Sequence, residues 1–323
     1  MLHAEAENLI ELANGRPGPK LRDRAPEQAR HIVRESFATL DCCEGSAAVS
    51  LDIVLEGPAG SIGARVYRPD MLLSHDVLLF FHGGGWVYGD LETHDGLCRT
   101  LASTLSVRVV AVNYHRAPEH VFPAAYLDGV AAMEWLAASP GQLGEGVSGI
   151  ILAGDSAGGN IAAALAANEG TGRPVRAQLL LYPVLDVAGQ SASYDEFDTG
   201  YLLEAADMEC FIASYIPDPL LRDGPCASPL RGPIADLPPT VIVTAGCDVL
   251  RDEGRAYAAR LIGAGIECHF LEAKGFPHNW ATSRRVLPSA RIHLNQAIDS
   301  LRQLISRQSQ SVTADQMERA PNA

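Results

Sequence analysis

A five-residue stretch, Gly154-Asp155-Ser156-Ala157-Gly158, constrains the fold of this chain more than any other part of its 323 residues. The apolar run that precedes it, residues 149–153, is typical of a buried strand. The alanine-rich run that follows it, residues 160–167, is typical of a helix. The chain must therefore bend sharply between the two, and the glycines around the serine relieve backbone crowding at that bend.

The serine at this bend has two interpretations. In a Gly-x-Ser-x-Gly nucleophile elbow, the hydroxyl of Ser156 stands exposed at the edge of a sheet, beside the N-terminus of the next helix. In the alternative, Ser156 only caps that helix and has no chemical role. The pattern is too short to choose between the two interpretations, so the rest of the chain has to decide.

Patterns typical of strands alternate with patterns typical of helices along most of the chain. Residues 49–55 and 62–67 alternate apolar with polar side chains, as edge strands do. Later strands are continuous apolar runs, which indicates that helices cover both faces of the sheet. We therefore predict an α/β fold with a mostly parallel central β-sheet flanked by helices on both faces. The expected buried strands are 76–81, 107–113, 150–153, 177–182, 240–245 and 266–271, and the clearest helices are 124–138 and 290–305.

Two segments interrupt this alternation and predict a cap over the sheet. Residues 1–40 contain short amphipathic helices, whose apolar stripes must pack on a later part of the chain. Residues 184–235 contain aromatic side chains and several prolines but no clear strand. We expect a single domain over 1–323, with a cap built from about 1–45 and 184–235. The polar residues 308–323 are predicted to form a disordered tail.

Charge and hydropathy argue against several classes of function. The net charge is −14, from 25 basic and 39 acidic residues, so the surface repels phosphate backbones and no nucleic-acid partner is expected. No apolar run reaches the roughly 20 residues that span a bilayer. The first residues carry Glu5, Glu7 and Glu11 where a signal peptide has a basic start, which predicts a cytoplasmic location.

The seven cysteines are odd in number and include no C-x-x-C pair. This pattern favours reduced thiols and gives no reason to expect a disulfide framework or a metal site. Cys247 precedes an aspartate discussed below, and we expect it to be a small buried side chain.

A serine hydroxyl is a weak nucleophile at neutral pH, so a catalytic Ser156 needs a base and a group that orients this base. Among ten histidines, His278 is the candidate base, because it lies in a Gly/Pro loop after the last expected strand. Asp248 is the candidate acid, because it directly follows a buried strand. Loops that leave the carboxyl ends of parallel strands meet at one edge of a sheet. The alternative role of Asp248 is to cap the next helix, and Asp252 and Glu253 are its rivals.

Three consecutive glycines, in His82-Gly83-Gly84-Gly85-Trp86, follow the strand expected at 76–81. They expose backbone N–H groups, and the absence of a following Gly-Lys-Ser/Thr argues against a phosphate-binding loop. The N–H groups of Gly83, Gly84 and Ala157 are the predicted donors to an oxyanion formed at Ser156. His82 has no partner at metal-ligand spacing, so we expect it to brace this loop. Asp155 is expected to anchor the elbow or neighbouring loops.

Together, these motifs resemble the hormone-sensitive-lipase-like carboxylesterases of the α/β-hydrolase fold. The resemblance implies Ser156 as nucleophile, Asp248 as acid and His278 as base, which is the order of such a triad along the chain. It also implies a helical cap and a possible homodimer through the last strand. The chain departs from the family at Val249, where a proline is usual, but at none of the reacting groups. The matching segments are 82–86 with 89–90, 113–120 with 122–125, 154–160, 227–230, 248–254 and the loop around residue 278.

The predicted function is that of a serine carboxylesterase that needs no cofactor and hydrolyses small esters with short to medium acyl chains. Two alternatives remain open. One is an amide or lactone hydrolase that uses the same triad. The other is a non-catalytic ligand-binding protein of the same fold, which the presence of His278 disfavours. The apolar pocket under the cap is expected to be lined by Trp86, Tyr201, Leu202, Phe211 and Trp280.

Overall fold

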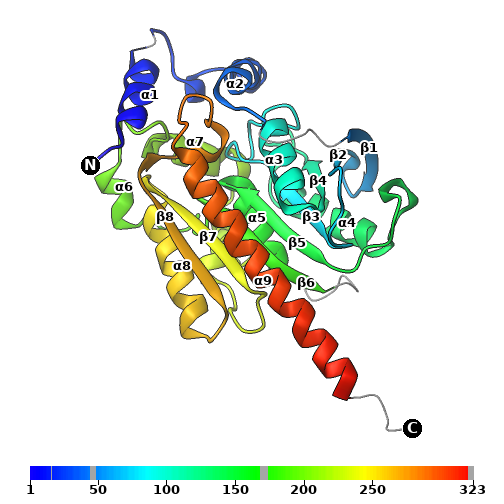
Figure 1. The fold of residues 1–323 in the computed structure, drawn as a ribbon. Coiled ribbons are helices and arrows are strands. Elements are labelled where there is room, and N and C mark those ends of the chain that lie inside the picture. Colours follow the sequence, from blue (N-terminus) through cyan, green and yellow to red (C-terminus); the bar gives the residue numbers. More distant parts are fainter. Residues whose placement is uncertain (16, 44–48, 168–173, 319–323) are drawn as a thin grey trace.

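The computed structural model describes residues 1–15, 17–43, 49–167 and 174–318, and its centre is an eight-stranded sheet (Figure 1). The strand order is β1-β2-β4-β3-β5-β6-β7-β8. β1 pairs with β2 and β2 with β4 in antiparallel orientation, whereas the pairs from β4 to β8 are parallel. The predicted mostly parallel sheet is therefore confirmed. The strands are β1 Val49–Gly57, β2 Gly60–Arg68, β3 Val77–Phe81, β4 Arg108–Asn113, β5 Ile150–Asp155, β6 Val175–Leu181, β7 Thr240–Cys247 and β8 Cys268–Pro277.

Helices cover both faces of this sheet, as its apolar strands require. Alternate side chains of a strand point to opposite faces, so Leu78 and Phe80 of β3 join one buried cluster while Leu79 and Phe81 join the other. The first cluster includes side chains of α3 and α9, which cross the near face in Figure 1, and the second includes α4, α5 and α8. The helices are α1 Ala4–Asn14, α2 Pro26–Leu40, α3 Asp95–Leu105, α4 Ala124–Ala137, α5 Ala157–Ala166, α6 Ala192–Glu196, α7 Ala205–Tyr215, α8 Arg251–Gly263 and α9 Ala290–Glu318.

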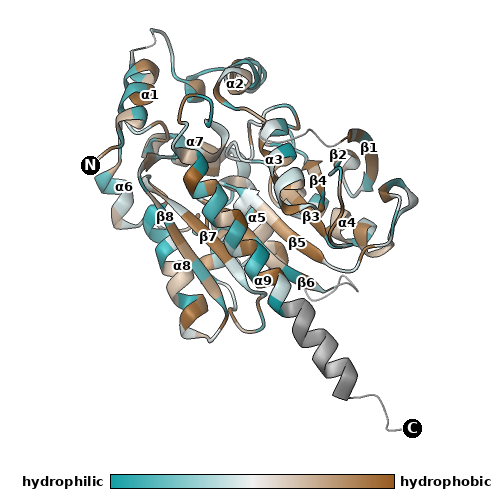
Figure 2. Cartoon of the chain, viewed as in Figure 1, coloured by the Kyte–Doolittle hydropathy of each residue, from teal (hydrophilic) through white to brown (hydrophobic). Residues whose placement is uncertain are grey.

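Hydropathy follows this layering. The strands in the middle of the sheet are strongly hydrophobic, whereas the helices alternate hydrophobic and hydrophilic residues along their length (Figure 2). All five residues of β3 are buried. This pattern is expected for parallel strands that are covered on both faces.

Polar side chains anchor the N-terminal segment to the rest of the domain. In α2, Arg30 donates to the carbonyl oxygens of Val87 and Ala117, both at 2.8 Å. After α2, the buried Asp41 accepts from Arg284 at 3.0 and 3.1 Å, and the Arg284 side chain is fully buried. Because removing one partner of such a pair leaves a buried charge uncompensated, these contacts hold the segment firmly in place.

The C-terminal helix is longer than the sequence predicts. α9 continues to Glu318, so the tail expected to be disordered from residue 308 is helical as far as the structure describes it, and 319–323 lie outside the described residues. The physical reason is that the segment contains no glycine or proline before Pro321 that would end a helix. Within the described ranges, neither α9 nor any other helix has the length and apolar character needed to cross a bilayer.

A buried carboxyl group, Glu253 of α8, joins this helix to the segment after β6. It is 2% exposed and accepts a hydrogen bond from the backbone N–H of Leu185 at 2.6 Å. Burial raises the pKa of Glu253 well above its ordinary value, with further contributions from the nearby Asp186 and Asp248 carboxylates. The protonated form of Glu253 is therefore favoured in the folded protein.

Replacing Glu253 by glutamine should remove a pH-dependent loss of stability. Because the folded-state pKa is raised, the contribution of Glu253 is fully present below the unfolded pKa, about 4.3, and is lost as pH rises through the folded value. Gln keeps an acceptor for Leu185 N–H. The free energy of unfolding of Glu253→Gln minus that of wild type should therefore rise by about 1 kcal/mol or more as the pH is raised from about 4.5 to 8. Urea unfolding at several pH values measures this, and a parallel pH dependence of both proteins would contradict it.

Candidate active site

The serine of the elbow adopts a backbone conformation that few residues other than glycine occupy. Ser156 has φ 54° and ψ −120° and lies between the end of β5 and the start of α5. A Cβ added at Gly158 would overlap the carbonyl oxygen of Phe81, and one at Gly154 would overlap the carbonyl of Gly158. The elbow is therefore held by close backbone packing. Ser156 occupies the N-cap position of α5, but its side chain makes no capping hydrogen bond to that helix.

Three loops bring Ser156, His278 and Asp248 together at the carboxyl edge of the sheet. The distance from Ser156 Oγ to His278 Nε2 is 2.8 Å, and that from His278 Nδ1 to Asp248 Oδ2 is 2.7 Å. All three residues are at most 5% exposed. Because a carboxylate can only accept, Nδ1 donates to Asp248 and Nε2 is left to accept from the serine hydroxyl. This arrangement allows the imidazole to take the serine proton.

Asp248 is not the N-cap residue of α8, which is Leu250. The Oδ1 atom of Asp248 accepts from the N–H of Leu250 at 3.1 Å, while Oδ2 faces His278. The other two carboxyl groups considered as the acid contact different partners. Asp252 pairs with Arg251 at 2.8 Å, and the buried Glu253 accepts from Leu185.

The glycine loop differs from the prediction in which N–H groups it leaves free. The N–H of Gly83 donates to Asp155 Oδ1 at 2.8 Å, so this predicted oxyanion donor is already occupied by the protein. Within the described part of the chain, the N–H groups of Gly84 and Gly85 have no acceptor, and Ala157 is the first residue of α5. The free donors are thus those of Gly84, Gly85 and Ala157. Gly85 was missed because sequence does not reveal that the carboxylate before Ser156 captures the first glycine of the loop.

Two side chains support this loop from behind. His82 stacks on Tyr114 with ring centroids 4.3 Å apart, and its Nδ1 lies 2.9 Å from Gly83 O. Burial lowers the pKa of His82 to about 3, so the imidazole is neutral and packs as an aromatic ring. His94, which sequence reasoning did not single out, lies 3.0 Å from Asp155 Oδ1 through its Nε2. Among the described residues, no group of three or more His, Cys, Asp or Glu side chains could hold a metal ion.

A cavity of about 630 Å³ lies over Ser156 and His278. Both segments expected to form the cap contribute to its wall, and so does the glycine loop. Leu202 and Phe211 line it as predicted from the sequence. The apolar side chains of its wall are Leu21, Ile32, Val33, Phe37, Tyr88, Leu202, Leu203, Met208 and Phe211.

The other three aromatic residues expected in this pocket lie outside it. Trp86 and Trp280 are completely buried; Trp86 stacks on Tyr215 at 4.7 Å, and Trp280 packs edge-on against Tyr182 at 5.6 Å. Their indole rings thus fill the protein core, and the walls described for the cavity do not include them. Tyr201 faces a second cavity. These three assignments to the substrate pocket are therefore corrected.

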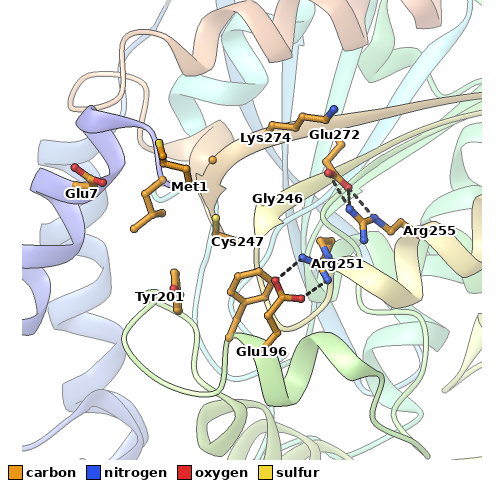
Figure 3. Close-up of a pocket in the computed structure, with 13 residues that line it drawn as sticks. Met1, Glu7, Glu196, Tyr201, Gly246, Cys247, Arg251, Arg255, Glu272 and Lys274 are labelled. Atoms are coloured by element: carbon orange, nitrogen blue, oxygen red, sulfur yellow. Dashed lines mark hydrogen bonds and ion pairs between the residues drawn. The ribbon is translucent and has the colours of Figure 1, made fainter.

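This second cavity, of about 550 Å³, lies between the N-terminal residues, α6, and the ends of β7 and β8 (Figure 3). Its wall is strongly polar: Arg251 pairs with Glu196 at 2.6 Å and Arg255 pairs with Glu272 at 2.8 Å. Cys247 contributes its thiol to this wall while being only 7% exposed, and burial raises its pKa. Neither Ser156 nor His278 is part of this wall, so the second cavity is separate from the candidate active site.

A profile of the family described as alpha/beta hydrolase fold matches residues 78–282. The chain is 39% identical over 259 residues to esterase LipI of Mycobacterium tuberculosis (strain ATCC 25618 / H37Rv), covering 78% of this chain and 81% of that protein. It is 36% identical over 285 residues to an ethyl acetate hydrolase of Pseudomonas putida, covering 86% of this chain and 90% of that one.

Two solved structures of ester hydrolases are also similar to this chain. The ester-hydrolase EH1AB1 from the metagenome of Lake Arreo superimposes with a TM-score of 0.87 at 34% identity, covering 96% of this chain and 100% of that chain. A thermostable esterase from Pseudomonas putida superimposes with a TM-score of 0.86 at 33% identity, covering 92% and 95%. The similarity thus extends over nearly the whole chain.

The elbow packing predicts a sharp contrast between two glycines. Gly158→Ala should destabilise the protein by at least about 3 kcal/mol, because the new methyl group overlaps the backbone carbonyl of Phe81, which cannot move aside. Gly141→Ala is the matched control, since nothing lies within 4 Å of a Cβ there. Its stability should stay within about 0.5 kcal/mol of wild type. Urea unfolding of both variants tests this, and equal stabilities would refute the packing argument.

Proposed function

The chain belongs to the hormone-sensitive-lipase-like carboxylesterases of the α/β-hydrolase fold and is a carboxylic ester hydrolase; on this premise, we propose that it cleaves esters through a triad of Ser156, His278 and Asp248. One observation carries the proposal. The serine hydroxyl, the two imidazole nitrogens and a carboxylate form a continuous hydrogen-bonded chain in the wall of a cavity, with distances of 2.8 and 2.7 Å.

The proposed reaction has two halves. Ser156 Oγ attacks the ester carbonyl as His278 Nε2 takes its proton, and Asp248 stabilises the imidazolium that results. The N–H groups of Gly84, Gly85 and Ala157 stabilise the oxyanion of the tetrahedral intermediate. His278 then protonates the departing alcohol, which leaves an acyl group on the serine. Water, deprotonated by His278, releases the acid and restores the hydroxyl.

We further propose that the substrates are small esters with short to medium acyl chains. The cavity volume of about 630 Å³ is within the range of small-molecule sites and is partly enclosed by the cap segments. Phe211 supports a limited depth, because a Cβ at Gly85 would overlap its ring and it therefore lies directly against the glycine loop. One relative that is 36% identical is named an ethyl acetate hydrolase, a name that is consistent with a small substrate.

The two alternative functions are not equally well supported. A non-catalytic binding protein is disfavoured by the named esterase relatives and by the hydrogen bond between His278 and Ser156. An amide or lactone hydrolase would use the same groups, because the triad serves acyl transfer in general. Matched ester and amide substrates with one acyl group separate these chemistries, and we expect the ester to react much faster.

We also propose a homodimer through β8. This strand is the last of the sheet, so one of its edges has no neighbouring strand among the described residues. Its Phe270 side chain is 37% exposed. An unpaired strand edge is a ready site for pairing with a second copy. Light scattering after gel filtration should give twice the mass of the chain, and a monomer at micromolar concentration would refute the dimer.

Replacing the proposed nucleophile should abolish turnover. Ser156→Ala should lower kcat for p-nitrophenyl butyrate by about 10⁶-fold, as expected when a triad serine is removed, while the protein stays folded. Wild type should be labelled by an organophosphonate at Ser156 in a 1:1 ratio, as detected by mass spectrometry. Substantial residual hydrolysis by the alanine variant, or labelling elsewhere, would eliminate this mechanism.

Enlarging the cavity should shift the acyl preference. In Phe211→Ala, the ratio of kcat/KM for an octanoate to that for a butyrate ester should rise about tenfold, which corresponds to roughly two further buried methylene groups at about 0.8 kcal/mol each. Tyr201→Phe is the control, since this residue faces the second cavity, and its ratio should equal that of wild type. An unchanged ratio in Phe211→Ala would show that this side chain does not limit the acyl chain.

A further inference from the structure

A buried pair of side chains, His94 and Asp155, lies directly behind the glycine loop and takes no part in the proposed proton transfers. Asp155 ends β5 immediately before Ser156, and His94 immediately precedes α3. They are 1% and 2% exposed, and His94 Nε2 lies 3.0 Å from Asp155 Oδ1. The following steps rest on the proposed function, because they concern the oxyanion that forms on attack by Ser156.

Asp155 connects this pair to the loop that provides the oxyanion donors. Its Oδ1 atom accepts both from His94 and from the N–H of Gly83, the latter at 2.8 Å. A Cβ at Gly83 would lie 2.5 Å from Asp155 Oδ2, so the loop rests directly on the carboxylate. The orientation of Gly84 and Gly85 therefore depends on where Asp155 holds the preceding residue.

The neighbours of His94 accommodate a proton on each of its ring nitrogens. The hydroxyl of Thr93 donates its one hydrogen to Asp90 O at 2.8 Å, and it lies 2.8 Å from His94 Nδ1. With that hydrogen on Asp90 O, Nδ1 is the donor toward Thr93, and Nε2 donates to Asp155 Oδ1. The N–H of Gly83 lies 3.3 Å from the same Nε2 and has its shorter contact, 2.8 Å, with Asp155 Oδ1. Burial disfavours the charge of His94, but Asp155 raises its pKa above the ordinary value, with smaller contributions from Asp41 and Asp90. The contacts accommodate an imidazolium, and the electrostatics favour it.

The other titratable groups around the pair leave its charge balance intact. Asp41 is paired with Arg284, and Asp90 with Arg34 at 2.8 Å. His82 is neutral, because burial lowers its pKa to about 3. Burial also raises the pKa values of the remaining neighbours well above their ordinary values, so that they stay uncharged; these are Cys98, Tyr114 and Tyr182.

We infer that His94 is a positioning residue that, as a cation, holds Asp155 and thereby fixes the glycine loop for oxyanion stabilisation. Its charge has a second effect. An uncompensated carboxylate next to Ser156 would repel the negative charge that develops in the transition state, and in a buried site this repulsion is weakly screened. His94 compensates it. The effect is specific to the transition state, so it acts on kcat and leaves the binding of neutral ester substrates nearly unchanged.

A double-mutant cycle tests this inference. His94→Gln leaves Asp155 buried without its cation, and kcat should fall by about 10²-fold, comparable to the loss of one oxyanion donor, with KM within about twofold of wild type. Asp155→Asn keeps an acceptor for Gly83 N–H without the charge, and its kcat should fall by about tenfold. Adding His94→Gln to Asp155→Asn should cost little more, because the cation then has no partner to compensate. Unchanged kcat in His94→Gln, or losses that multiply, would overturn the inference.

A second His–Asp pair, in which only the carboxylate is fully buried, provides the matched control. His115 Nδ1 lies 2.8 Å from Asp128 Oδ2, and Asp128 is completely buried, but neither lines the cavity. His115→Gln should lower the melting temperature and leave kcat per active site unchanged. Active sites are counted in each variant by organophosphonate titration of Ser156. If wild-type Ser156 is not labelled, the proposed function fails; if it is labelled and His94→Gln keeps its kcat, only the role of His94 fails.

The protonation state of His94 gives a readout that a purely structural role would not move. In wild type at pH 7, nitrogen-15 NMR should find both ring nitrogens of His94 protonated, and in Asp155→Asn the ring should be neutral. Because the pKa is raised, the cation persists above the ordinary value of about 6.5 and is lost as pH rises through the raised value. kcat should therefore decline over that range in wild type and lack this decline in Asp155→Asn. A neutral ring in wild type at pH 7 would refute the assignment.

Discussion

The close packing of the nucleophile elbow against the end of β3 is the constraint on which the rest of the site depends. Gly158 approaches the carbonyl of Phe81 so closely that no side chain fits between them. The chain that leaves β3 is the glycine loop, so this contact places the proposed oxyanion donors beside the serine. The bend itself requires a positive φ at Ser156, a conformation that persists only because the surrounding packing enforces it.

Each buried carboxylate around this elbow faces a hydrogen-bonding or charged side chain. Asp248 faces His278, Asp155 faces His94, and Asp41 faces Arg284. Each carboxylate would be costly to bury alone, and each pair joins segments that are distant in the chain. The site thus gains rigidity from the same contacts that satisfy its polar groups. This is the physical reason why a loop-built site can hold donors in the fixed orientation that oxyanion stabilisation requires.

The cavity depends on a different kind of contact. Its wall combines the N-terminal segment, the insertion after β6 and the glycine loop, and the first two meet through ion pairs of Lys20 and Arg22 with Glu204 and Asp207. The segments that form the wall could be recognised in the sequence, because they break the alternation of strands and helices. Which side chains face the cavity could not be recognised in the sequence, since an aromatic residue such as Trp86 or Trp280 fits a buried core as well as a pocket wall.

The sequence by itself determined the mostly parallel sheet, through the contrast between alternating and continuous apolar strands, and the candidate triad, through the strand-end positions of Ser156, Asp248 and His278. These are local signals, because periodicity and strand ends depend on neighbouring residues. Tertiary structure alone decided that Asp155 accepts a hydrogen bond from the N–H of Gly83, which leaves Gly85 as a free donor in place of Gly83. It also decided that His94 contacts this carboxylate. Such choices depend on which buried groups become neighbours across distant segments, and hydrogen-bond satisfaction in the folded core settles them.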